Sequence, residues 1–318
     1  MITSRFAPSP TGRLHLGHAW SAVQAHDRAR AEGGRFLLRI EDIDGSRSRR
    51  EHVEAILDDM TWLGLAWDGP VVFQSERVPL YAEALEQLHS SGHTYRCFCT
   101  RADIAAEIAA AGSAPHDDDT PPPHPAACRH RSPAEIEARL ADGEPFAWRL
   151  DMAAATASYI HASPAKAGAQ DRAGRDWAPA FAGEAFSRNG QLVWHDEVAG
   201  PQVATPESAG DVVLWRKDAP ASYHLAVTVD DAAQRVTHVV RGRDLFESTH
   251  VHRLLQAMLD LPTPVYRHHA LLSDAGGKRL AKRHGAPTLA DLRADYPDGR
   301  VLARALRAGT LPNGYRSA

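Results

Sequence analysis

Two histidines near the N-terminus, His15 and His18, stand in a setting that suits a phosphate group. They close the segment 5–18, RFAPSPTGRLHLGH, in which two prolines forbid a helix and Thr-Gly allows a tight turn. We expect a strand over 2–7 before this turn and a helix from about 16 to 31 after it. The N-terminus of such a helix presents unpaired N–H groups and the positive end of its dipole to an anion. Histidine can also donate to phosphate oxygens without a fixed charge, so the segment predicts a phosphate site.

A glycine and two opposite charges complete this end of the expected sheet. Gly17 leaves room for a ligand ring to lie against the backbone. The segment 35–40, RFLLRI, predicts a buried strand that ends at Glu41. Arg5 and Glu41 would then lie at the carboxyl ends of neighbouring parallel strands, where open α/β sheets bind ligands. The pair suits the carboxylate and the ammonium of an amino acid; an ordinary ion pair is the alternative.

Two further side chains that suit a carboxylate, Tyr223 and Arg241, follow in the second half of the chain. The segments 223–231 and 235–244 alternate in polarity around two aspartates, which predicts two strands joined by a turn. The planar fork of Arg241 can bind a carboxylate through two hydrogen bonds, and Tyr223 adds a hydroxyl. A core tyrosine and a surface arginine are the alternative interpretation.

A basic loop rich in glycine follows at 276–284, GGKRLAKRH. Glycines make such a loop mobile. The ammonium of Lys282 can then follow negative charge that develops on phosphate groups during a reaction.

Three cysteines and one histidine have the types and spacing of a closed zinc site: Cys97, Cys99, His124 and Cys128. Zinc takes four nitrogen or sulfur ligands, and two cysteines one residue apart in an extended segment point the same way. His116 and His130 compete with His124 as the nitrogen donor. Free buried thiols without a metal are the alternative.

Composition and charge describe the molecule that must hold these residues. At 318 residues and 43% hydrophobic, the chain can bury a large core, and we expect one main domain with elaborations. No apolar run is long enough to span a membrane and no signal peptide precedes the first motif, so we expect a cytoplasmic protein without a membrane partner. Three cysteines argue against a disulfide framework.

The net charge of −4 excludes a protein coated in positive charge, so any contact with nucleic acid must be local. Basic residues cluster over 28–50 and 278–307, either as phosphate contacts or as solvated faces. Apolar residues at helical spacing predict core helices within 53–63, 80–88 and 251–259. From about 153 to 209 this pattern fails, which we interpret as a mobile insertion without a catalytic role.

The segment 5–18 resembles the signature of class I aminoacyl-tRNA synthetases, with HLGH at 15–18 in place of the family's HIGH element. Its leading arginine and two prolines are similar to the glutamyl branch of that class, and 276–284 takes the place of the KMSKS loop, with Ala281 where a serine is usual. The resemblance implies catalytic roles for His15, His18 and Lys282, with Gly17 joining them in ATP binding. It implies a glutamate site formed by Arg5, Phe6, Ala7, Pro8, Ser9, Glu41, Tyr223 and Arg241.

The same resemblance implies two metals, a structural zinc and Mg²⁺ that accompanies ATP. In the branch concerned, a tyrosine usually stands at the place of His124. The segment 163–184 resembles no part of the family pattern.

The fold class implied by the resemblance is α/β, with a Rossmann catalytic domain of the class I synthetase type. Its halves would be 1–93 and 210–260, separated by an inserted zinc-bearing subdomain at 94–209. A KMSKS-like loop and a short helical segment would follow at 261–318. Only about 35 residues follow the loop, so we expect no anticodon-binding domain.

The resemblance is then to shortened members of the glutamyl branch. They are implied to activate L-glutamate with ATP and to transfer it to the queuosine base in the anticodon of tRNA(Asp). We expect a monomer whose partners are ATP, glutamate and the tRNA(Asp) anticodon arm. Two alternatives stay open: a shortened glutamyl-tRNA synthetase that charges a tRNA 3′ end, and a non-catalytic RNA-binding paralogue.

Overall fold

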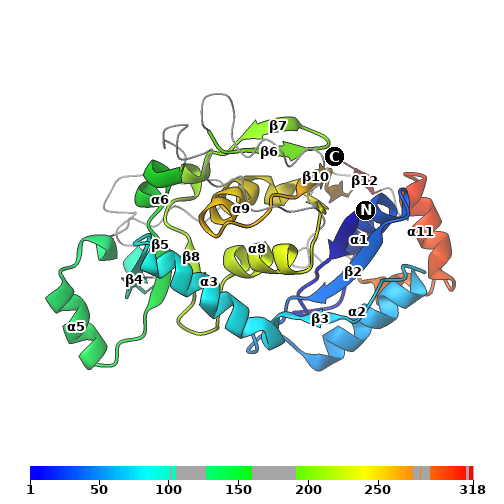
Figure 1. Cartoon of the computed structure of the whole chain (residues 1–318). Helices are drawn as coiled ribbons and strands as arrows, with labels where there is room; N and C mark the ends of the chain where they lie inside the picture. The colour runs from blue at the N-terminus through cyan, green and yellow to red at the C-terminus, as the bar shows by residue number, and fades with distance from the viewer. Residues whose placement is uncertain are drawn as a thin grey trace.

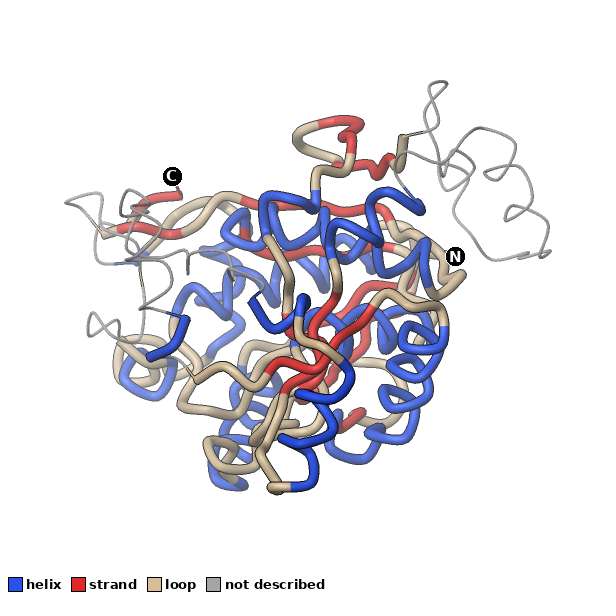
Figure 2. Tube along the Cα trace, turned by 90° about the vertical axis from the view of Figure 1, so that its left-hand side faces the viewer, coloured by secondary structure: helices blue, strands red, loops and turns tan. Residues whose placement is uncertain are grey.

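A sheet that is largely parallel lies between helices at the centre of the molecule, as the two views of this computed structural model show (Figure 1, Figure 2). The structure describes residues 1–100, 102–104, 127–159, 191–274, 280, 287–312 and 315–317. The strands of the central sheet are β1 (Thr3–Phe6), β2 (Arg35–Ile40), β3 (Val72–Phe73), β6 (Val193–Asp196), β7 (Gly200–Val203), β9 (His238–Gly242) and β10 (Val265–His269).

The central sheet is built from two groups of strands that meet where β1 lies beside β9. One group is parallel throughout and has the order β1–β2–β3. The other has the order β7–β6–β10–β9, in which only β7 is antiparallel to its neighbour. The Thr237 N–H donates to the Thr3 carbonyl at 2.9 Å and so links the two groups. The carboxyl ends of β1, β2 and β9 therefore lie at one edge of a common sheet.

The helices that pack on this sheet are α1 (Leu16–Arg30), α2 (Arg50–Trp62), α3 (Val78–Ser90), α8 (Tyr223–Ala233) and α9 (Phe246–Met258). Short 3-10 turns stand at η1 (Gln74–Arg77), η3 (Pro206–Ala209) and η4 (Arg243–Leu245). Four alanines of α1 are fully buried and give it a thin face, which lets it lie close to β1, β2 and β9: Ala19, Ala22, Ala25 and Ala29. Helices α3, α8 and α9 pack together in a separate apolar core.

A small antiparallel sheet carries the cysteines at one end of the molecule (Figure 1). The strands of this sheet are β4 (Thr94–Cys97), β5 (Ala147–Leu150) and β8 (Val213–Trp215). The helical segments that accompany them are η2 (Ala127–His130), α5 (Pro133–Ala141) and α6 (Met152–Tyr159). The buried carboxylate of Asp211 fastens this unit to the body. It accepts hydrogen bonds from the Tyr95 hydroxyl at 2.7 Å, from Arg129 at 2.9 Å and from the Met152 N–H at 3.0 Å.

The last described elements lie near α1: β11 (Leu272–Ser273), α10 (Leu289–Leu292), α11 (Gly299–Arg307) and β12 (Arg316–Ser317). Helix α11 packs on α1, and Gly299 begins it because a β-carbon there would collide with the ring of Trp62. Among the described residues, no helix is both long enough and apolar enough to cross a membrane.

The strands expected at 2–7 and 35–40 and the helix expected from about 16 to 31 are confirmed as β1, β2 and α1, and β1 is parallel to β2. Helices also cover most of 53–63, 80–88 and 251–259. These elements follow a clear apolar period or are bounded by proline and glycine.

The strand expected over 223–231 is wrong, because this segment forms helix α8, and its two aspartates are helical rather than a turn. Seven consecutive residues of α8, from Leu225 to Asp231, are buried. The middle of the segment holds three consecutive β-branched residues, Val227, Thr228 and Val229, which are types that favour strands. They make the segment look like a strand.

The insertion expected over 153–209 is partly wrong. Residues 153–159 belong to helix α6. Residues 191–209 contain β6, β7 and η3, and β6 pairs with β10 inside the central sheet. Residues 163–184, which matched no family pattern, lie outside the described residues. The short length of β6 and β7, four residues each, explains why no period was visible.

The basic cluster over 28–50 is expected to make phosphate contacts or to form a solvated face, and three of its arginines do neither. Arg39 is completely buried. Arg28 binds Glu197 at 2.8 Å, and Arg30 binds Asp68 at 2.8 Å. The arginines of this cluster that stay exposed are Arg35, Arg47, Arg49 and Arg50.

Arg39 belongs to a buried network that ties α8 to β1 and β2. Its Nη1 donates to Asp231 Oδ1 at 2.8 Å, and the same carboxylate accepts Nε and Nη2 of Arg5 at 3.0 and 3.1 Å. The adjacent Asp230 accepts hydrogen bonds from the Tyr81 hydroxyl and from Gln74, both at 2.8 Å. Burial by itself raises the pKa of Asp231, but the charges of Arg5 and Arg39 outweigh it and lower the pKa.

We expect Arg39→Met to lower the free energy of unfolding by about 3–5 kcal/mol, because it leaves two buried carboxylates without their shared cation. Urea denaturation followed by circular dichroism measures the change. The matched control is Arg50→Met, since Arg50 pairs with Glu54 at 3.0 Å but its side chain is 93% exposed. The control should keep the wild-type midpoint. Equal midpoints for the two variants would contradict the prediction.

Candidate active site

A cavity of about 410 Å³ opens where β1, β2 and β9 end and α1 begins. Eleven of the residues singled out from the sequence line it: Arg5, Phe6, Ala7, Pro8, Ser9, His15, Gly17, His18, Glu41, Tyr223 and Arg241. These residues come from segments more than 200 positions apart, and the β1–β9 contact brings them to one place. Lys282 lies outside the described residues.

His15 and His18 close the first turn of α1 and also line the cavity. His15 Nδ1 accepts a hydrogen bond from the Gly17 N–H at 3.1 Å, and His18 Nδ1 accepts one from the His15 N–H at 3.0 Å. The two imidazoles lie 3.8 Å apart between centroids. Because each Nδ1 is an acceptor, each ring carries its proton on Nε2 in the neutral form. Both rings can therefore donate from Nε2 to an anion.

Position 17 favours glycine for a structural reason as well as for the room that it leaves for a ligand. A β-carbon at this position would stand 3.0 Å from Cε1 and 3.1 Å from Nδ1 of His15. A larger residue would thus require the His15 ring to shift by a few tenths of an ångström. The glycine keeps the histidine pair closed over the helix N-terminus.

Arg5 and Glu41 lie on adjacent strands of the cavity wall. Two nitrogens of Arg5 are held by Asp231, and among the described residues nothing accepts a hydrogen bond from its Nη1. That nitrogen is therefore left to bind an anion. The Glu41 carboxylate lies 3.7 Å from Arg39.

The Glu41 carboxyl has an unusual pKa. Burial raises it to about 7, although the charges of Arg39 and Arg5 act in the opposite direction. An ammonium group placed in the cavity would compensate the buried carboxylate and bring the pKa down again.

Arg241 is fixed at the end of β9 by contacts to all three of its nitrogens. Nη1 donates to the Tyr223 hydroxyl at 3.1 Å, Nη2 to Thr249 Oγ1 at 2.6 Å, and Nε to His268 Nε2 at 3.1 Å. Only 6% of Arg241 is exposed. The Arg241–Tyr223 pair is a preformed donor surface for a carboxylate.

Sequence reasoning missed several residues of the cavity wall: Thr11, Trp20, Ser21, Asp244, His269 and Leu271. Ser21 Oγ lies 2.9 Å from His269 Nε2, and Trp20 donates to the Ala270 carbonyl at 3.1 Å. Trp20 and Ser21 stand three and four residues after Gly17, so helical spacing from the motif could have found them. No local pattern marks His269, which reaches the wall only through β10.

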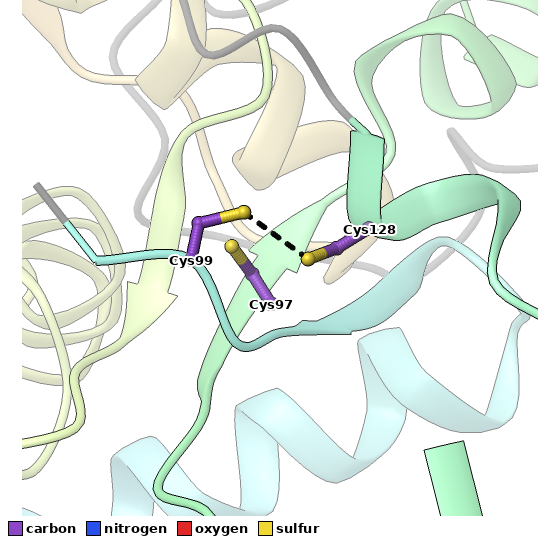
Figure 3. A group of neighbouring side chains, drawn as sticks. All are labelled: Cys97, Cys99 and Cys128. Atoms are coloured by element: carbon purple, nitrogen blue, oxygen red, sulfur yellow. Dashed lines mark hydrogen bonds between the residues drawn. The ribbon is translucent and has the colours of Figure 1, made fainter. Parts of the chain in front are cut away.

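The three thiols of the small sheet converge (Figure 3). The sulfurs of Cys97, Cys99 and Cys128 lie within 4.8 Å of one another, and those of Cys99 and Cys128 are 3.2 Å apart. Burial raises the pKa of Cys99. For Cys128, hydrogen bonds from Arg131 and Cys99 outweigh burial and lower the pKa to about 7.

The thiol spacing fits zinc. Tetrahedral ligation with Zn–S bonds of about 2.3 Å places sulfurs about 3.8 Å apart, and thiolates are ligands that zinc prefers. His130 is exposed, and both His124 and His116 lie outside the described residues.

The family of this chain follows from sequence comparison. Residues 1–162 and 185–317 match the family described as tRNA synthetases class I (E and Q), catalytic domain. The match omits 163–184, the segment that fitted no family pattern. A Rhodobacter capsulatus protein named glutamyl-Q tRNA(Asp) synthetase is 45% identical over 93% of this chain and 95% of its own length. One of the same name from Symbiobacterium thermophilum is 42% identical over 92% and 82%.

Solved structures agree with the sequence relatives. A glutamate tRNA ligase from Elizabethkingia meningosepticum, solved with its amino acid, superposes with a TM-score of 0.67 at 27% identity. The alignment covers 89% of this chain but 52% of the ligase, so the chain spans about half of that longer protein. The α/β fold described above is thus the fold of class I catalytic domains. The chain belongs to the class I tRNA synthetases for glutamate and glutamine, and it is an ATP-dependent ligase of that family.

Proposed function

We propose that this enzyme activates L-glutamate with ATP and transfers the glutamyl group to the queuosine base in the anticodon of tRNA(Asp). The observation that carries the proposal is the cavity, which places two arginines, a buried carboxyl and two Nε2–H histidines around one space. The similarity to proteins named glutamyl-Q tRNA(Asp) synthetase, 45% and 42% identical over more than nine-tenths of this chain, adds support.

In the proposed binding mode, charge decides the orientation of glutamate. Glu41 receives the ammonium group. Nη1 of Arg5 and the Arg241–Tyr223 pair receive the side-chain carboxylate, with Phe6, Ala7, Pro8 and Ser9 forming the wall beside it. The α-carboxylate then stays free to react, which a site for an activated amino acid requires.

Activation needs no nucleophile from the protein. An oxygen of the α-carboxylate attacks the α-phosphorus of ATP, the bond to the bridging oxygen breaks, and pyrophosphate leaves. His15 and His18 donate to phosphate oxygens from Nε2, and the N-terminus of α1 stabilises the negative charge. We assign to Lys282 the neutralisation of the leaving pyrophosphate.

Magnesium fits this cavity as a companion of ATP. The described wall holds only two carboxylates, Glu41 and Asp244, so the ion would be held chiefly by phosphate oxygens and water. When bound, it supplies further neutralisation of phosphate charge.

Transfer follows from the reactivity of the mixed anhydride. A hydroxyl of the queuosine ring attacks the glutamyl carbonyl carbon, an ester bond forms, and AMP leaves. The anticodon arm would have to enter the open side of the cavity. The exposed Arg47, Arg49 and Arg50 follow β2 and are the phosphate partners that we assign to this arm.

We further propose that Cys97, Cys99 and Cys128 hold a structural zinc with His124 as the fourth ligand. The support is the convergence of the three sulfurs and the match of their spacing to zinc. Such a site would stabilise the small sheet, which buries little apolar surface of its own.

The proposed acceptor predicts that an isolated tRNA(Asp) anticodon stem-loop is glutamylated only when it carries queuosine, because the hydroxyl that reacts belongs to that base. The measurement is mass spectrometry of nucleosides after incubation with enzyme, ATP and glutamate. A matched stem-loop with guanine at the same position is the control. Inactivity on both stem-loops, together with charging of tRNA(Glu) at its 3′ end, would replace the proposal with that of a shortened glutamyl-tRNA synthetase.

The raised pKa of Glu41 predicts how glutamate binding depends on pH. The carboxyl must ionise to meet the ammonium, so affinity is full above pH 7 and falls about tenfold per unit below it. Calorimetric titration with glutamate between pH 5.5 and 8 measures the slope. Glu41→Gln should bind glutamate more weakly, and its affinity should not depend on pH in this range. The surface variant Glu32→Gln should keep the wild-type pH dependence. A slope that survives in Glu41→Gln would assign it to another group.

The metal proposal predicts one zinc per chain in freshly purified protein and its loss in Cys97→Ser, together with a lower melting temperature. Elemental analysis and thermal denaturation measure both. His124→Ala should also lose the metal, whereas the control His130→Ala should retain it. Wild-type protein free of zinc would leave the thiols as core residues.

A further inference from the structure

A buried chain of three side chains stands behind the cavity and ends on Arg241. Asp196 Oδ2 accepts a hydrogen bond from His268 Nδ1 at 2.7 Å, and His268 Nε2 accepts one from Arg241 Nε at 3.1 Å. Asp196 and His268 are 0% and 4% exposed. Neither residue lines the cavity.

The direction of each hydrogen bond in this chain is fixed by Arg241. A guanidinium can only donate, so His268 Nε2 must be an unprotonated acceptor. The single proton of the neutral ring must then lie on Nδ1, where Asp196 accepts it. Burial lowers the pKa of His268, which agrees with a neutral ring.

Asp196 is held so that one of its oxygens always faces His268. Its Oδ1 accepts the Val198 and Ala199 N–H groups, both at 2.9 Å, in the turn from β6 to β7. Its Oδ2 accepts the backbone N–H of His268 at 3.0 Å in addition to the ring. The pairing of β6 with β10 sets this geometry, since Tyr266 lies opposite Asp196.

The ring of His268 has little freedom to turn. Phe246 lies 5.0 Å and Trp194 5.9 Å from it between centroids. Thr249 Oγ1, which accepts from Arg241 Nη2, lies 3.2 Å from His268 Nε2.

We propose that Asp196 and His268 are positioning residues for glutamate: Asp196 fixes the Nδ1–H form of His268, whose Nε2 then holds the Arg241 fork in its carboxylate-binding orientation. The inference rests on the proposed role of Arg241. It assigns a function to the segment that holds β6, far from the recognised motifs in the sequence.

Asp196→Asn tests the hydrogen bonds from Asp196 through His268 to Arg241, because an amide can donate a hydrogen bond where the carboxylate only accepts one. The new NH₂ group can point at Nδ1, which moves the ring proton to Nε2 and places two donors against each other at Arg241. His268→Gln tests the same link differently, since its amide oxygen can accept from Arg241 whatever Asp196 does.

Glutamate-dependent pyrophosphate exchange gives KM for glutamate, KM for ATP and kcat. We expect Asp196→Asn to raise KM for glutamate about 10- to 100-fold, the scale of one hydrogen bond to a charged group. The values of kcat and of KM for ATP should stay within about twofold, because the contact is equal in the ground and transition states. In the His268→Gln background, Asp196→Asn should add nothing to KM for glutamate.

Nitrogen NMR of histidine-labelled protein gives a readout independent of activity. The resonances that disappear in His268→Gln identify the ring, which should be the Nδ1–H form in the wild type and the Nε2–H form in Asp196→Asn. Asp211→Asn is the matched control, because Asp211 is likewise a buried carboxylate with side-chain and backbone donors but lies beside the small sheet, just before β8. It should change the melting temperature and leave KM for glutamate unchanged.

Two results would overturn the inference: an unchanged KM for glutamate in Asp196→Asn, or the full effect of that substitution in the His268→Gln background. Arg241→Gln separates this failure from failure of the proposed function. If Arg241→Gln leaves KM for glutamate unchanged, the role of Arg241 itself is wrong. If Arg241→Gln raises it and Asp196→Asn does not, only the positioning role is wrong.

Discussion

The buried ion pairs between α8 and the first two strands are the interaction on which the site depends. Asp231 accepts from Arg5 on β1 and from Arg39 on β2, so one carboxylate joins elements that lie about 200 residues apart in the sequence. Removing such a carboxylate from water is costly unless every partner is in place. The same contacts occupy two nitrogens of Arg5 and leave the third for a ligand. The contacts that stabilise the fold therefore also fix the position of Arg5 in the cavity wall.

At the N-terminus of α1, too, the same contacts serve both the fold and the site. His15 caps the helix and His18 completes the capping box, and these contacts fix which nitrogen of each ring carries its proton. The capping motif therefore also sets the donors of the phosphate site that we propose for the two histidines. The Asp196–His268 pair repeats this principle at Arg241, where a buried acceptor sets the tautomer that a neighbouring group needs.

The small sheet is attached to the body by apolar packing and by polar contacts. Leu150 and Leu214 of the sheet are fully buried in the core formed by α3, α8 and α9. Arg129, next to Cys128, donates to both Asp151 and Asp211, and Lys217 donates to the Phe98 carbonyl at 2.7 Å. A metal at the cysteines would order the residues beside these contacts.

The sequence by itself determined the elements whose information is local: β1, β2 and α1, with prolines, a glycine turn and an apolar period, and the motif residues that they carry. It could not determine α8, because the β-branched residues in its middle favour a strand and only tertiary packing makes them helical. It could not determine the place of β6 either, because a four-residue strand carries too few positions to show a period. Tertiary structure alone decided which nitrogens of Arg5 and Arg241 are occupied and which tautomer His268 adopts. These properties depend on partners such as Asp231 and Asp196, whose distance along the chain leaves no local trace.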